Sequence, residues 1–125
     1  MTPAILPLDE AREYWFDEGC FITEFSNSAT DPALSIARAR VPAGQATQWH
    51  RLAGITERYV ILNGQGTVEI ADLPPQGVAP GDTVVIPPLC RQRILASGAE
   101  DLIFLALCTP RFVPDAYENM ETLSA

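Results

Sequence analysis

The residues with the clearest chemical potential lie between Gly44 and Gly64. This stretch holds the only histidine of the chain, His50, and a carboxylate seven residues further on, Glu57. Both belong to segments that read as β-strands, joined by a loop at Gly54, so the two strands can fold back and bring both side chains to one face. An imidazole and a carboxylate that converge inside a small β-barrel form half of a metal site.

The elements that would position these groups are short strands separated by turn residues. We expect about nine such strands and no long amphipathic helix, which is the pattern of an antiparallel all-β sandwich or barrel. The clearest strands are Cys20–Ser26, Leu34–Val41, Thr47–Leu52, Glu57–Leu62, Thr67–Ala71, Thr83–Ile86, Cys90–Leu95 and Leu102–Cys108.

Three of these strands are expected to supply a pocket, because side chains two residues apart share a face. The inward-facing residues are then His50 and Leu52 from the first strand, Glu57, Tyr59 and Ile61 from the second, and Cys90, Gln92 and Ile94 from the third.

Two further expectations concern the arrangement of the strands. The apolar segments Thr83–Ile86 and Leu102–Cys108 should lie centrally in the sheets. Asn63-Gly64 is a hairpin signal, which would pair the strand before it with Thr67–Ala71.

The length of 125 residues fits one domain, 1–125, with a barrel core over about 20–109. We expect a short helix in each terminal segment (the N-terminal arm 1–19 and the C-terminal tail 110–125). These helices would cover Leu8–Trp15, capped by Asp9, and Asp115–Glu121. The aromatic cluster Tyr14–Phe16 is expected to pack on the barrel or against a second subunit, which favours a homodimer.

Charge and cysteine content narrow the partners and the compartment. The net charge is −8, which argues against nucleic acid or an anionic membrane as a partner. Three cysteines without motif spacing do not form a disulfide framework, and neither a signal peptide nor a membrane-spanning run is visible. A cytoplasmic location with reduced thiols is therefore expected.

The spacing of these residues resembles the two motifs of the cupin superfamily. Gly44, His50, Glu57 and Gly64 match the first motif, in which Leu52 replaces a second histidine. The second motif is matched at Gly81 and Pro87, with Leu89 in place of a glycine, Gln92 in place of a histidine and Ala96 in place of an asparagine. The resemblance implies a double-stranded β-helix, or jelly-roll barrel, as in small single-domain bacterial members.

The resemblance also implies a metal site with a degenerate ligand set. Carried over by position, its ligands would be His50, Glu57 and the oxygen of Gln92, holding Zn²⁺, Fe²⁺, Mn²⁺ or Ni²⁺, while Leu52 cannot bind metal. Alternatively, metal binding is lost, and His50 forms a hydrogen-bonded pair with Glu57 or Gln92 in a polar pocket.

Two functions remain open at this point. The chain is either a metal-dependent enzyme acting on a small polar molecule, such as a sugar or a hydroxy- or keto-acid, or a metal-free module that binds or senses a small ligand. In the enzyme, Tyr59 would serve as acid, base or hydrogen-bond donor to the substrate.

Overall fold

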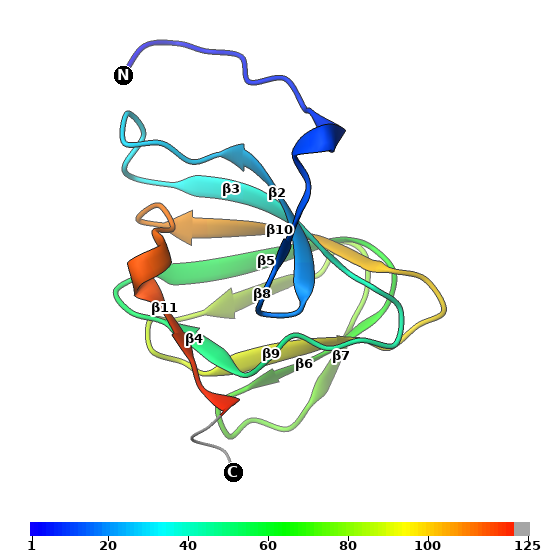
Figure 1. The fold of residues 1–125 in the computed structure, drawn as a ribbon. Helices are drawn as coiled ribbons and strands as arrows, with labels where there is room; N and C mark the ends of the chain where they lie inside the picture. Colours follow the sequence, from blue (N-terminus) through cyan, green and yellow to red (C-terminus); the bar gives the residue numbers. More distant parts are fainter. Residues whose placement is uncertain (122–125) are drawn as a thin grey trace.

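A computed structural model describes residues 1–121 of the chain. In this part, eleven short strands form two antiparallel sheets, which lie one above the other in Figure 1. The all-β fold predicted from the sequence is therefore confirmed. The upper, six-stranded sheet contains, in spatial order, β1 (Tyr14–Phe16), β2 (Cys20–Ser26), β3 (Ser35–Val41), β10 (Leu102–Thr109), β5 (Thr56–Asn63) and β8 (Thr83–Ile86). The five-stranded sheet contains β11 (Tyr117–Asn119), β4 (His50–Leu52), β9 (Gln92–Ala96), β6 (Gly66–Ile70) and β7 (Gln76–Val78).

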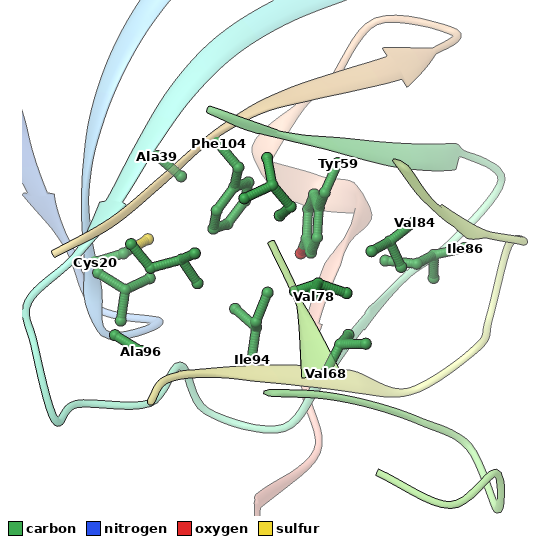
Figure 2. Close-up of a cluster of buried hydrophobic side chains, with 13 residues drawn as sticks. Cys20, Ala39, Tyr59, Val68, Val78, Val84, Ile86, Ile94, Ala96 and Phe104 are labelled. Carbon is green, nitrogen blue, oxygen red and sulfur yellow. The ribbon is translucent and has the colours of Figure 1, made fainter. Parts of the chain in front are cut away.

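The hydrophobic core fills the space between the sheets. Strand alternation produces it: in β5, Tyr59 and Ile61 are buried, while Arg58 and Val60 between and beside them are only partly covered. Figure 2 shows the Tyr59 ring beside Phe104 of β10, with ring centroids 4.3 Å apart. A second, smaller cluster around Leu52 and Cys108 lies under the C-terminal tail.

The predicted N-terminal helix is wrong except for its first turn. Only η1 (Glu10–Arg12) is helical, a 3-10 turn that Asp9 caps by accepting a hydrogen bond from the backbone N–H of Ala11. The aromatic cluster that follows forms β1, which pairs with β2 because its three residues gain a full antiparallel partner there. No helix in residues 1–121 has the length and apolar character that a membrane crossing requires.

The predicted C-terminal helix over Asp115–Glu121 is also wrong. A 3-10 turn, η2 (Pro114–Ala116), leads directly into the strand β11. β11 pairs with β4, placing Tyr117 opposite Leu52 and Asn119 opposite His50. Pairing covers the edge of β4, a long-range gain that overrides the local helical preference of the tail.

Two expectations about strand order also need correction. β10 is central, as predicted, but β8 is the edge strand of its sheet and leaves Val85 58% exposed. The turn at Asn63-Gly64 does not make a hairpin, because β6 pairs with β7 and β9 in the other sheet. Gly64 has φ +81°, and a Cβ there would lie 2.5 Å from the carbonyl oxygen of Asp101, so this crossing between the sheets needs glycine.

Candidate ligand-binding site

A cavity of about 70 Å³ opens among side chains from both sheets and the C-terminal tail. Its walls include apolar side chains such as Ile22, Leu52 and Ala106. Its ionisable and aromatic lining residues are Glu18, Glu24, His50, Glu57, Cys108, Tyr14, Phe16, Phe112 and Tyr117.

The strands deliver the predicted residues to this region from opposite sheets. β4 turns His50 and Leu52 inward and Arg51 outward. Gln92, the first residue of β9, lies directly opposite His50 in the strand register. Glu57 comes from β5 in the facing sheet, so the polar site spans the gap between the two layers.

Gln92 and Tyr59 hold Glu57 in a buried hydrogen-bond network. Gln92 donates from Nε2 to Glu57 Oε1 at 2.8 Å, and its Oε1 accepts the hydroxyl of Tyr59. The Tyr59 hydroxyl lies 3.4 Å from the same carboxylate oxygen. Tyr59 and Gln92 are not among the residues lining the cavity, so they position Glu57 rather than reach the cavity themselves.

The titration of this network follows from its burial. Burial and the charge of nearby Glu18 raise the pKa of Glu57, and the hydrogen bonds from Gln92 and Tyr59 offset this only in part. Burial also raises the pKa of Tyr59 well above its ordinary value, so its hydroxyl stays protonated and remains a donor.

Two groups orient His50: the backbone carbonyl of Gln48 and an acidic residue that was not predicted from the sequence. Its Nδ1 lies 2.7 Å from the carbonyl oxygen of Gln48, which can only accept, so Nδ1 carries a proton. Its Nε2 lies 3.1 Å from Glu18 Oε1, and both side chains are shielded from solvent, with 2% and 14% exposed. The imidazole also stacks on Tyr117, with ring centroids 5.2 Å apart.

The Glu18–His50 contact requires a proton on one of its two groups. Burial lowers the pKa of His50, and burial raises the pKa of Glu18 to about 7. A neutral ring with a bare Nε2 and an ionised carboxylate would repel each other at this distance. The contact therefore needs a proton on Glu18 or on Nε2.

Glu18 was missed because its position depends on a strand pairing that the sequence did not predict. It lies in the turn between β1 and β2, next to Gly19, which has φ +110°. Because the predicted helix ran to Trp15, the direction of this turn was left undefined. The only local signal was an acid followed by a glycine between aromatic segments.

The other predicted pocket residues have different surroundings. Leu52 lines the cavity, as expected for the position where a second histidine would stand. Ile61 and Ile94 lie in the main hydrophobic core, and Cys90 packs against that core, so these three are not among the residues lining the cavity. The three cysteines are free thiols.

One of the predicted metal ligands, Gln92, is engaged by other side chains in this arrangement. Both ends of the Gln92 amide are engaged, so its oxygen would have to leave the Tyr59 hydroxyl before it could bind an ion. Within residues 1–121, no group of three His, Cys, Asp or Glu side chains is placed to hold a metal. His50 is oriented like a metal-binding histidine, since a carbonyl fixes its Nδ1, but its Nε2 contacts Glu18.

Comparison with known structures identifies the fold. KdgF from Halomonas sp. is 18% identical, with a TM-score of 0.75, and the match covers 87% of this chain and 96% of that one. Pac13, a nucleoside dehydratase, is 16% identical with a TM-score of 0.76, covering 94% and 92% of the two chains. A variant of Streptomyces Pac13 has also been solved with uridine. Since a cupin domain and a double-stranded β-helix protein are also among the similar structures, this chain has the cupin fold.

Sequence comparison shows the family of the chain. It is 32% identical over 117 residues to the uncharacterized protein MJ1618 of Methanocaldococcus jannaschii, a match that covers 92% of this chain and 90% of that protein. The chain belongs to the same family as MJ1618. No family model matches the sequence.

Proposed function

We propose that the chain binds a small polar molecule in the cavity and exchanges a proton with it through Glu18, His50 and Glu57. The observation that carries this proposal is the buried Glu18–His50 contact, at 3.1 Å, in the wall of the cavity. A proton in a buried contact between a carboxyl and an imidazole can move from one group to the other when a ligand changes their surroundings. Similar folds that act on or bind small molecules, among them the nucleoside dehydratase solved with uridine, support this use of the cavity.

The same groups serve either an enzyme or a binding protein. In an enzyme, the pair would give a proton to the reacting atom and recover it, while Glu57, held by Gln92 and Tyr59, would accept or stabilise charge. In a binding protein, they would act only as hydrogen-bond donors and acceptors.

The single histidine provides the test. With histidine labelled by ¹⁵N and no affinity tag, the imidazole signals of His50 alone report its tautomer and protonation. We expect at least one member of a panel of neutral, anionic and cationic small metabolites to shift these signals at millimolar concentration. The cavity-filling variant Ala106→Leu should abolish that response. If no panel member shifts the signals, or if Ala106→Leu responds as the wild type does, the proposal fails.

Metal binding is the second candidate, favoured by the orientation of His50. We keep as its ligands the residues predicted from the sequence: His50, Glu57 and Gln92. A Zn²⁺, Fe²⁺, Mn²⁺ or Ni²⁺ ion bound there would supply a Lewis acid. Because the Gln92 oxygen accepts from Tyr59, metal binding would require that hydrogen bond to break, which is a testable cost.

A homodimer and a cytoplasmic location stay predictions. The dimer would form at β1, the outer strand of its sheet, where Tyr14 and Trp15 are 45% and 52% exposed. An edge strand with exposed aromatic side chains offers both backbone groups and apolar surface to a second copy.

A further inference from the structure

The charge of the cavity restricts what it can take. Glu18, Glu24 and Glu57 line it, and His50 is the only lining group that could become a cation. The chain has no lysine, and within the described residues no arginine lines the cavity. A carboxylate or phosphate ligand would therefore be desolvated next to acidic groups without a permanent positive partner, which is strongly unfavourable.

The two buried carboxyl groups, those of Glu18 and Glu57, can each still accept a hydrogen bond. Each uses its Oε1 for the strong contacts described above. Among the described residues, the Oε2 of Glu57 is approached only by the Cys108 thiol, at 3.8 Å, and the Oε2 of Glu18 only by the Cys20 thiol, at 3.7 Å. Because thiols are weak donors, each Oε2 can still accept a hydrogen bond from a ligand.

The Tyr117 hydroxyl is a buried donor that needs a hydrogen-bond acceptor. Within residues 1–121, it is the buried side-chain polar atom that has no hydrogen-bond partner, and its residue lines the cavity. A tyrosine hydroxyl is protonated at neutral pH, so it is available as a donor. A buried donor without a partner is unfavourable, which points to a ligand or water that supplies an acceptor.

We infer that the cavity takes a neutral molecule with at least two hydroxyl groups, a small polyol or the hydroxyl-bearing end of a sugar, and that it excludes organic acids. One hydroxyl would donate to a carboxyl Oε2, and another would accept from Tyr117. An ammonium group has three donors but no acceptor, so it cannot satisfy the Tyr117 proton. This inference rests on the proposed function and narrows its substrate class.

The size of the cavity agrees with a small ligand. At about 70 Å³, it has room for about five to seven water-sized groups, close to the three carbons and three oxygens of glycerol. The apolar walls at Ile22, Leu52 and Ala106 would contact the carbon chain while the hydroxyls face the polar end.

The test compares ligands that share a carbon skeleton. Glycerol and glycerate differ in one group, erythritol and erythronate form a longer pair, and 1,3-diaminopropane keeps three carbons but carries no hydroxyl. Each is titrated into the ¹⁵N-histidine protein near neutral pH, with the His50 signals as the readout. We expect the polyols to bind at least tenfold more tightly than the matching acids, and the amine to bind more weakly than glycerol.

Three variants test which side chains determine the affinity for polyols and the discrimination against acids. Tyr117→Phe should weaken the binding of glycerol at least threefold. Tyr14→Phe, at another tyrosine lining the cavity, should leave this affinity unchanged. The double variant Glu18→Gln with Glu57→Gln removes both buried carboxyls and should narrow the polyol-to-acid ratio at least tenfold.

The outcomes separate this inference from the proposed function. Acids that bind as tightly as the polyols, an amine that binds most tightly, or a Tyr117→Phe variant that keeps full affinity would each overturn it. If the polyols fail while another member of the metabolite panel shifts the His50 signals, the inference is wrong and the proposed function stands. If nothing shifts them, the proposed function itself is refuted.

Discussion

The burial of Glu18 predicts how the stability of the protein depends on pH. Its pKa is raised from 4.5 to about 7 in the folded state, with burial as the main cause. Between these values the folded state keeps a proton that the unfolded state loses. The contribution of Glu18 to the free energy of unfolding therefore falls as pH rises through this window and is constant above it.

The size of the effect follows from the two pKa values. For a single group shifted in this way, the stability lost between about pH 5 and about pH 8 is about 2.5 kcal/mol. The conversion applies because only 14% of the Glu18 side chain is exposed. Glu18→Gln keeps the shape and a hydrogen-bond donor toward His50 but cannot ionise. It should therefore gain about 2.5 kcal/mol relative to wild type over the same range.

Urea unfolding of metal-stripped protein at both pH values measures this difference. Glu24→Gln is the matched control, because Glu24 lines the same cavity but is exposed to solvent. Other groups shift in the wild type too, including His50, whose lowered pKa acts in the opposite direction. The comparison with Glu18→Gln removes the contributions of groups that Glu18 does not influence, while those of His50 and Glu57 stay coupled to it. A difference between wild type and Glu18→Gln that stays constant from pH 5 to pH 8 would refute the reasoning.

Three further predictions concern the metal, the network and the assembly. Metal binding is measured by calorimetric titration of metal-stripped protein with Zn²⁺, Mn²⁺, Fe²⁺ and Ni²⁺. His50→Ala should abolish binding, Leu52→His should tighten it, and the affinity should fall on acidification as His50 protonates. Identical wild-type and His50→Ala titrations for every metal would exclude the site. Gln92→Leu should destabilise the protein by about 2–4 kcal/mol in urea unfolding, because it leaves Glu57 and the Tyr59 hydroxyl buried without that partner, and a loss below 1 kcal/mol would contradict the network. Light scattering at micromolar concentration should give the dimer mass, and a monomer mass would exclude pairing through β1.

The sequence alone was sufficient for the local part of the structure. Strand alternation placed Cys20–Ser26 and Thr83–Ile86 at their observed bounds and turned His50 and Glu57 inward. These features depend on neighbours one or two residues away, since the period of a strand and the residues that end it are written in the chain itself. The match to the cupin motifs then added the closure of the strands into two facing sheets.

The tertiary structure alone decided which groups share the site. Glu18 reaches His50 only because β1 pairs with β2, and Tyr117 stacks on the same ring only because the tail adds β11 to the edge of β4. The packing of the two sheets brings Gln92 of β9 against Tyr59 and Glu57 of β5, so its oxygen is not free. Such contacts are set by the burial of apolar surface and the pairing of edge strands across the whole domain. No local pattern around Glu18 or Tyr117 encodes them.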